Sequence, residues 1–345
     1  MPKPQLAIIL AALIATACSS GAAAPTPTAT VAASAASTPT EVPITKMTVA
    51  YSSVSGDKLA LFVAADGGIF TKNHLDVDPQ AINGSTEAIA SLLAGQATVG
   101  QFSAADALSA EAGGADLVVV GIMTPVYPYH LFVRKGINTI ADLKGKKIAV
   151  TDAGGATDIA TRAMLKRNGL DPDKDVDIVS VGSHANRTAA LLNGAVDAGV
   201  DDVPSDKALI AAGLTPLIDL AAAKVPAADS ALVFQRSYVN AHKEAVQAYV
   251  DSMVQALAYA RANKDFTVGV LGKYFKITDT PLMERTYTFF LNEVMPIYPT
   301  PDPTLLGDAI SVLSAKNPAI ANVDLKKLLD PSYVDSARAR KLAGS

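Results

Sequence analysis

The sequence predicts an α/β protein with two lobes, each a sheet flanked by helices, and a hinge between the lobes. A repeated segment is the first reason: Leu92–Gly100 reads LLAGQATVG, and Leu191–Gly199 reads LLNGAVDAG with the same spacing of its Leu pair and glycines. The second reason is that short apolar runs alternate with helical patterns over Ile140–Pro204, which is typical of β-α-β units. The third is size, because 345 residues that are 50% hydrophobic suffice for two cores.

The first residues, 1–17, are predicted to be a signal peptide. Lys3 supplies a positive start, and Leu6–Ala15 is an apolar run too short to span a bilayer. Cys18, which follows Ala15-Thr16-Ala17, resembles the lipidated first residue of a mature bacterial lipoprotein. An ordinary signal peptide with a chance cysteine is the alternative. Cys18 is the only cysteine, so no intrachain disulfide and no thiolate metal site are expected.

Residues 18–45 are predicted to form a disordered tether carrying the lipid. This stretch is dominated by Ala, Thr, Ser and Pro, and Glu41 is its only charged residue between Cys18 and Thr45. Such a composition cannot bury enough apolar surface to offset the entropy of ordering.

Lobe 1 is predicted to comprise residues 46–126 and 226–345. Its first part alternates strands and helices, with Gly67-Gly68 ending the first helix. The predicted strands are Met47–Tyr51, Leu75–Ile82, Val99–Phe102 and Leu117–Met123, and the helices are Lys58–Asp66, Thr86–Ala94 and Ala104–Ala112. Its second part is a strand, Ser230–Gln235, followed by the helices Val239–Ala262, Thr267–Tyr274, Pro281–Glu293 and Thr304–Ser314.

Lobe 2 is predicted to span residues 127–225, with hinge crossings near 124–130 and 221–229. Two prolines break regular structure in the first crossing, which reads TPVYPYH. Within the lobe, the strand Lys147–Val150 leads into the Gly-rich turn Asp152–Thr157, and Thr157 is the expected N-cap of the next helix. A helix is also expected over Val203–Ala212, with Asp202 either capping it or contacting a ligand. Two crossings suit a hinge that closes on a ligand.

The candidate binding residues follow the strands, because ligands in open α/β sheets lie beyond the carboxyl ends of strands. The Gly-rich turn adds free N–H groups at a helix N-terminus, although it could also be an ordinary turn. The predicted ligand-binding residues are Ser52, Ser53, Gln101, Phe102, Ser103, Tyr127, Tyr129, Asp152, Gly155, Ala156, Thr157 and Asp201.

Composition and motifs argue against other classes of function. The net charge of −4 and the absence of a basic block exclude a nucleic-acid partner. We find no nucleophile elbow, P-loop, zincin or dinucleotide-binding motif, so no catalytic residue and no cofactor are predicted. The four histidines lack metal-ligand spacing, and no metal is expected. His130 is taken as a hinge residue, and His184 as a solvated loop residue that could face the cleft.

The chain resembles the NMT1/THI5-like group of solute-binding proteins from ABC importers, which carry sulfonates, nitrate, thiamine-type pyrimidines and riboflavin. The resemblance rests on AADGGIF (Ala64–Phe70), Leu92–Gly100, LKGKKIAV (Leu143–Val150), MLKRNGL (Met164–Leu170) and Leu191–Ala198. It implies a two-lobe periplasmic-binding-protein fold, type II-like, and a monomer exported to the cell envelope. The implied partners are a small molecule, an ABC permease and its ATPase, and the membrane through the lipid on Cys18. The group's pyrimidine synthase uses a Cys-rich motif, which this chain lacks.

The expected ligand is set by charge. Asp152, Asp201 and Asp202 would lie near one cleft, and no Arg or Lys falls in the turns, so an anion should be repelled. The first choice is therefore riboflavin or a thiamine-type pyrimidine, stacked on Tyr127 and Tyr129. Taurine, an alkanesulfonate or nitrate is the alternative, because helix N-termini bind anions without Arg. An enzyme of unrecognised type is the other class, which turnover by the purified protein would reveal.

Overall fold

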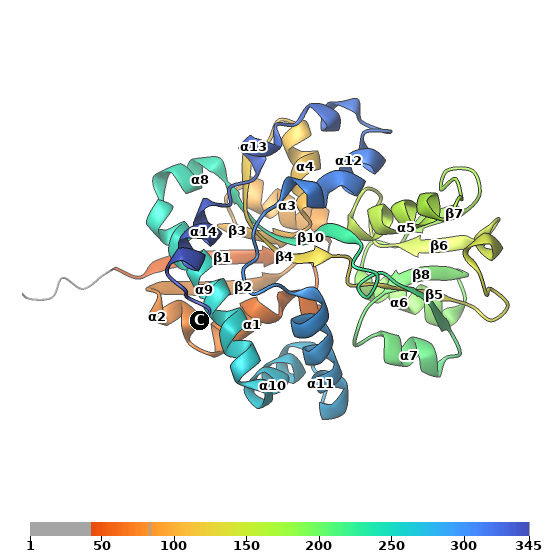
Figure 1. Ribbon diagram of the computed structural model, residues 1–345, viewed down its shortest axis with the longest axis horizontal. Helices are drawn as coiled ribbons and strands as arrows, with labels where there is room; N and C mark the ends of the chain where they lie inside the picture. The colour runs from red at the N-terminus through yellow and green to blue at the C-terminus, as the bar shows by residue number, and fades with distance from the viewer. Residues whose placement is uncertain (1–42, 83, 345) are drawn as a thin grey trace, which may run out of the picture. The chain divides into compact units, whose positions relative to one another are not determined.

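The computed structural model describes residues 43–82 and 84–344, and these contain two five-stranded sheets with helices on both faces (Figure 1). The predicted signal peptide, Cys18 and the tether as far as residue 42 lie outside the described residues. The strands are β1 (Thr45–Tyr51), β2 (Leu75–Ala81), β3 (Val99–Phe102), β4 (Leu117–Val126), β5 (His130–Val133), β6 (Lys147–Val150), β7 (Asp177–Ser180), β8 (Ala198–Asp201), β9 (Thr215–Asp219) and β10 (Pro226–Gln235).

Fourteen α-helices, four 3₁₀ segments and one π-helix are assigned in the described residues. The α-helices are α1 (Leu59–Asp66), α2 (Ile69–Lys72), α3 (Ser85–Leu93), α4 (Ala104–Ala112), α5 (Ala156–Arg167), α6 (His184–Asn193), α7 (Asp206–Ala211), α8 (Arg236–Ala241), α9 (Lys243–Ala262), α10 (Lys264–Phe275), α11 (Thr280–Thr288), α12 (Gly307–Leu313), α13 (Leu325–Leu328) and α14 (Ser332–Ala339). The 3₁₀ segments are η1 (Gly56–Lys58), η2 (Ile140–Leu143), η4 (Pro303–Leu306) and η5 (Pro318–Asn322), and η3 (Phe289–Val294) is a π-helix. Among the described helices, none has the length and apolar character needed to cross a bilayer.

The two sheets share one strand order. The first sheet runs β2-β1-β3-β10-β4, with β10 antiparallel to both of its neighbours. The second runs β7-β6-β8-β5-β9, with β5 antiparallel to both of its neighbours. In each sheet the antiparallel strand lies beside the third of three parallel strands: β10 lies beside β3, and β5 lies beside β8. This is the two-lobe periplasmic-binding-protein fold that the sequence predicts.

The repeated segment occupies equivalent places in the two sheets. The first copy joins α3 to β3, and the second joins α6 to β8. Gly95 and Gly194 follow the two helices with φ of 71° and 85°, a left-handed conformation that glycine adopts without a Cβ penalty. The internal repeat in the sequence therefore marks the same structural unit in each sheet.

The cores follow from strand alternation. In β1, Met47, Val49 and Tyr51 pack with α1 and α9, whereas Ala50 faces the other side with α3 and α4 (Figure 1). In the second sheet, α5 covers one face, and α6 and α7 cover the other (Figure 1). The chain passes from the first sheet to the second between β4 and β5, and it returns between β9 and β10.

Several predicted helices differ from the observed ones at their boundaries. The predicted helix Val239–Ala262 breaks at His242, whose φ of −134° and ψ of 43° are not helical. The helix predicted over Val203–Ala212 begins only at Asp206, after Pro204 and the N-cap Ser205, so Asp202 is not a cap. Gly155, not Thr157, is the N-cap of α5. Thr157 instead accepts a hydrogen bond from the Thr151 amide at 2.9 Å, which fastens the turn to the preceding strand.

Candidate ligand-binding site

A cavity of about 80 Å³ lies at the carboxyl ends of strands from both sheets. Ser52 and Ser53 follow β1, Ser103 follows β3, Asp152 follows β6 and Asp202 follows β8. The remaining lining residues are Ser55, Asp57, Lys58, Gly84, Ser85, Tyr129, Thr151, Gly155, Ala156, Thr157, His184, Arg187 and Asp229. The position agrees with the rule that ligands bind where parallel strands end.

Four helices direct their N-termini at this cavity. Gly84 and Ser85 start α3, Ser103 caps α4 by accepting from the Ala105 amide at 3.0 Å, Gly155 caps α5 and His184 starts α6. Each of these helices has nine residues or more. Their dipoles and free N–H groups give the cavity a partial positive potential, which favours an anionic or hydrogen-bond-accepting group.

Two cations line the cavity, which corrects the expectation of a cleft without Arg or Lys. Arg187 is 2% exposed, and it donates from Nη1 to Thr151 Oγ1 at 2.6 Å and from Nη2 to Asp201 Oδ1 at 3.4 Å. Burial opposes its charge, but Asp201 and Asp202 outweigh burial, and the pKa of Arg187 lies above its usual value. Its Nε has no hydrogen-bond partner within the described chain. Lys58 is also buried, where it pairs with Asp57.

Besides Asp57, three acids share the cavity with these cations. Burial raises the pKa of Asp229 to about 7, and the charge of Asp57 adds to this effect. The Tyr129 hydroxyl donates to Asp229 Oδ1 at 2.6 Å, which fixes both side chains. Burial, and then the charge of Glu87, raises the pKa of Asp152. Burial also raises the pKa of Asp202 to about 7, although the charge of His184 opposes it.

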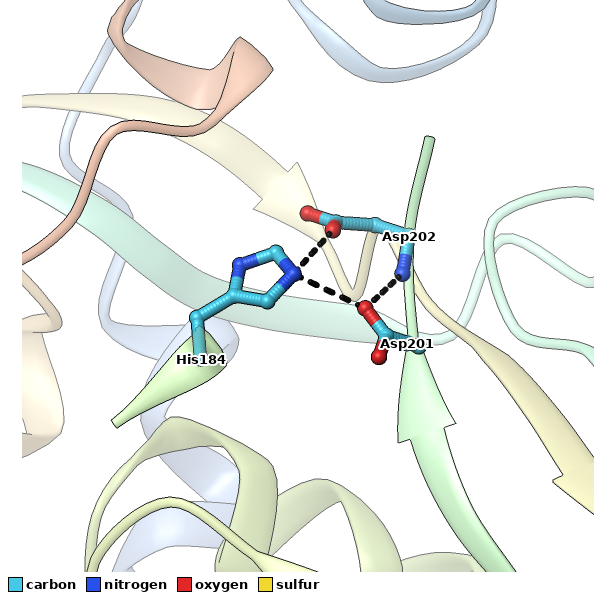
Figure 2. Close-up of side chains that lie close together, drawn as sticks. All are labelled: His184, Asp201 and Asp202. Carbon is cyan, nitrogen blue, oxygen red and sulfur yellow. Dashed lines mark hydrogen bonds and ion pairs between the residues drawn. The ribbon is translucent and has the colours of Figure 1, made fainter. Parts of the chain in front are cut away.

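His184, Asp201 and Asp202 come together at one wall of the cavity (Figure 2). His184 Nε2 lies 2.9 Å from Asp201 Oδ1 and 3.4 Å from Asp202 Oδ1. Burial would lower the pKa of His184, but the two carboxylates outweigh it and raise that pKa. Asp201 is fully buried, yet Arg187 and His184 overcome the burial effect and hold its pKa at about 2. His184 therefore begins a helix beside two acids and is not a solvated loop residue.

Eight of the twelve predicted binding residues line the cavity: Ser52, Ser53, Ser103, Tyr129, Asp152, Gly155, Ala156 and Thr157. These eight were predicted because they follow strands, lie in the Gly-rich turn Asp152–Thr157 or lie in the first crossing between the sheets.

The other four predicted residues do not line it. Gln101 is buried and donates to the Asp57 carbonyl and to Ser230 Oγ, both at 3.4 Å. The Phe102 ring folds back over Gly100, where a Cβ would lie 2.1 Å from it. Tyr127 lines a separate void of about 10 Å³, and the Asp201 carboxylate lies behind the wall.

Sequence reasoning missed Lys58, Arg187 and Asp229. Arg187 lies one turn into α6, Lys58 ends a short 3₁₀ turn, and Asp229 lies within β10, whose direction is opposite to that of its neighbours. None of the three directly follows a parallel strand, so the strand-end rule does not find them. The repeated unit offered one usable signal for Arg187, since it places the start of α6 at the cleft.

Known proteins share this fold. The periplasmic aliphatic sulphonate binding protein SsuA from Escherichia coli has a TM-score of 0.67 and 20% identity, with 83% of this chain and 92% of that chain covered. The desulfurization enzyme DSZB has a TM-score of 0.61 and 19% identity, with 85% of this chain and 99% of that chain covered. At these identities, both likenesses establish the fold alone.

A sequence relative and a family model give the closer relation. The protein named "Putative binding protein YtlA" from Bacillus subtilis (strain 168) is 27% identical over 158 residues, which are 45% of this chain and 47% of that protein. The aligned segment thus spans about half of YtlA. The model of the family described as "NMT1/THI5 like" matches residues 56–265, which is more than half of the chain. The chain belongs to the NMT1/THI5-like family.

Proposed function

We propose that the protein is the extracytoplasmic substrate-binding subunit of an ABC importer, and that it captures a small zwitterion in the cavity between its sheets. The family, the two-lobe fold and a relative named for binding support a carrier role. SsuA, which shares the fold, is named for binding an aliphatic sulphonate, and this makes a sulfonate the anionic group to test first. Attachment through a lipid on Cys18, and docking on a permease with its ATPase, belong to the same proposal.

One observation carries the ligand class: opposite charges face the same small cavity. The N-termini of α3 and α5, together with Arg187, favour an anionic group in the cavity. Asp152 and Asp229, which line the same cavity, favour a cationic or hydrogen-bond-donating group. An aminoalkanesulfonate such as taurine carries both groups on a short chain. A simple anion such as nitrate would leave the acids without a partner, which costs binding energy.

The size of the cavity also favours a small ligand. Pockets for drug-sized ligands enclose about 300–1,000 Å³, whereas this cavity encloses about 80 Å³. Riboflavin, with its tricyclic ring and ribityl chain, is too large for that space. The ligand we propose has only a few non-hydrogen atoms.

A thiamine-type pyrimidine is the second candidate, and Tyr129 is the observation that favours it. The Tyr129 ring lines the cavity and is held by its hydrogen bond to Asp229, so an aromatic ring could stack on a preformed surface. An aminopyrimidine would also donate hydrogen bonds to the acids. Its ring lacks an anionic group for Arg187, which places it behind taurine.

A thermal-shift panel tests the proposal. Purified protein, treated with EDTA and dialysed, is heated with taurine, ethanesulfonate, nitrate, a thiamine-type pyrimidine or riboflavin. Taurine should raise the melting temperature most, because ligand binding to the native state stabilises it by mass action. The enzyme hypothesis is checked in parallel by looking for new products from each compound. A shift with riboflavin alone, or turnover of any compound, would overturn the proposal.

A further inference from the structure

The cluster of His184, Asp201 and Asp202 carries an inference that does not depend on the identity of the organic ligand. We propose that these residues form a binding site for a divalent transition-metal cation, of the zinc class, in the wall of the cavity. The three residues come from two elements, since His184 starts α6 while Asp201 ends β8 and Asp202 follows it (Figure 2). Their candidate ligand atoms all lie within 4.8 Å of one another.

The spacing of the ligand atoms suits a tetrahedral ion. Zinc binds imidazole nitrogen and carboxylate oxygen at about 2.0–2.2 Å, so two ligands of a tetrahedral site lie about 3.3 Å apart. His184 Nε2 lies 2.9 Å from Asp201 Oδ1 and 3.4 Å from Asp202 Oδ1. One His and two carboxylates also form a donor set that zinc accepts. Two of the three ligand pairs therefore already have nearly the spacing of a tetrahedral site.

Asp202 supplies an independent reason to expect a cation. It is 3% exposed, and its Oδ1 accepts no hydrogen bond from the described residues. The same oxygen points at His184 (Figure 2). A buried carboxylate oxygen without a donor costs free energy, and a bound cation would supply the missing partner.

The surroundings hold Asp201 in place while leaving it free to bind. Thr188 Oγ1 donates to Asp201 Oδ2 at 2.7 Å, and the Asp202 amide donates to Oδ1 at 2.9 Å. Hydrogen bonds of this kind orient carboxylates around metal ions. Arg187 Nη2 lies 3.4 Å from Asp201 Oδ1. A strong charge-assisted hydrogen bond is shorter, at about 2.7–2.9 Å. Arg187 therefore competes only weakly for that oxygen.

The proposed source of a fourth ligand is the cavity, although Ser205 Oγ also lies 3.1 Å from His184 Nε2. Both His184 and Asp202 line the cavity, whereas Asp201 lies behind them. Zinc sites with three protein ligands keep one position for water or for a bound molecule. The fourth ligand here would be water, or an anionic or amine group of a molecule held in the cavity.

Calorimetric titration with ZnCl₂ tests the site directly, on EDTA-treated and dialysed full-length chain without any organic ligand. We expect one zinc ion per chain. His184→Gln and Asp202→Asn should each weaken binding at least about tenfold, because even residues that only orient a metal ligand contribute roughly 10- to 100-fold to affinity. His242→Gln is the matched control, because it removes an exposed imidazole that is remote from the cluster in sequence, and it should leave binding unchanged.

A second readout covers the case in which a variant fails to fold. Cobalt(II) added to the wild-type chain should give the intense visible absorption of a four-coordinate ion, and zinc should remove it. Absence of one-to-one zinc binding to the wild type would overturn the proposal. Full retention of binding in both folded variants would also overturn it. Neither result bears on taurine binding, which is measured on metal-free protein.

Discussion

At the level of single residues, Arg187 sets the charge of the cavity. Its guanidinium is buried between Thr151 and Asp201, and its Nε has no partner within the described chain. A buried cation with a free donor favours an anionic group nearby. Arg187 removes the premise of the prediction that an anion would be repelled, namely a cleft without Arg or Lys.

Replacing Arg187 should therefore weaken the binding of taurine. We expect Arg187→Gln to raise the Kd by roughly 10- to 100-fold, because a charge-assisted hydrogen bond is lost in a buried site. Calorimetry measures this directly. Arg338→Gln is the control, since Arg338 pairs with Asp335 on the exposed surface. An unchanged Kd for Arg187→Gln would show that the anionic group binds elsewhere.

Asp229 should make the stability of the ligand-free protein depend on pH. Burial raises its pKa to about 7 in the folded state, whereas an unfolded chain has an Asp pKa of about 3.9. The folded state thus holds the proton more tightly, so the free energy of unfolding falls as pH rises from about 4 to about 7, by up to about 4 kcal/mol. Asp57, Lys58, Tyr129 and Asp202 face this group and modulate the size of the effect.

The Asp229→Asn variant isolates that contribution. Its amide still accepts from the Tyr129 hydroxyl but carries no charge, so the variant should gain stability over wild type at about pH 8 and little at about pH 4. Urea unfolding at several pH values measures the difference. A wild-type advantage that grows with pH would contradict the assignment.

Sequence reasoning at this scale succeeded where a residue follows a strand. Ser52, Ser103 and Asp152 were predicted in this way, and all three line the cavity. It failed for Lys58 and Asp229, because tertiary packing brings an interior turn and an antiparallel strand to the cleft. Local pattern carries no information about either placement.

At the level of elements, the repeated helix–glycine–strand unit was predictable and decides the architecture. Both copies place a glycine with positive φ after a helix and lead into the third parallel strand of a sheet.

Helix ends were less predictable than the repeated unit. The segment Pro281–Glu293 reads as one helix, but it changes at Phe289 from α11 to the π-helix η3, and the local pattern gives no sign of that change.

Gly95 and Gly194, the glycines that follow the two repeated helices, should differ in how much their replacement by alanine destabilises the protein. A Cβ on Gly95 would meet nothing within 4 Å, so Gly95→Ala should cost only the left-handed strain of about 1–2 kcal/mol. A Cβ on Gly194 would lie 3.0 Å from Nη2 of Arg134, which itself donates to the Leu191 carbonyl at the end of α6. Gly194→Ala should therefore destabilise the protein more than Gly95→Ala does. Equal shifts of the urea midpoint would contradict this contact.

For the whole molecule, ion pairs join α5 and α7, which flank the second sheet, to the C-terminal part of the chain. Arg285 in α11 donates to both carboxylate oxygens of Asp206 in α7, at 2.6 and 2.5 Å. Lys207 pairs with Asp279, and Arg167 pairs with Asp308 at 2.8 Å. Asp206 is 3% exposed, so it depends on its partner. We expect these contacts to favour the closed arrangement of the two lobes.

Loss of the Arg285 pair should favour an open arrangement. Arg285→Gln leaves a buried carboxylate unpaired, so we expect a larger radius of gyration without ligand and a taurine Kd raised about threefold to tenfold. Small-angle scattering and calorimetry provide the two measurements. Lys264→Gln is the control, because Lys264 pairs with Glu284 on the exposed surface between α10 and α11. The same scattering profile for Arg285→Gln and wild type would show that the Arg285–Asp206 ion pair does not hold the two lobes closed.

The central claim is that the cavity binds a small molecule that carries one positive and one negative group. Calorimetric titration of metal-free protein with taurine, and then with ethanesulfonate, tests it most directly, because the two differ at the amine. We predict that taurine binds and that ethanesulfonate binds at least tenfold more weakly, since Asp152 and Asp229 then lose their partner. Equal affinity for the two compounds, or no heat with taurine, would contradict the account.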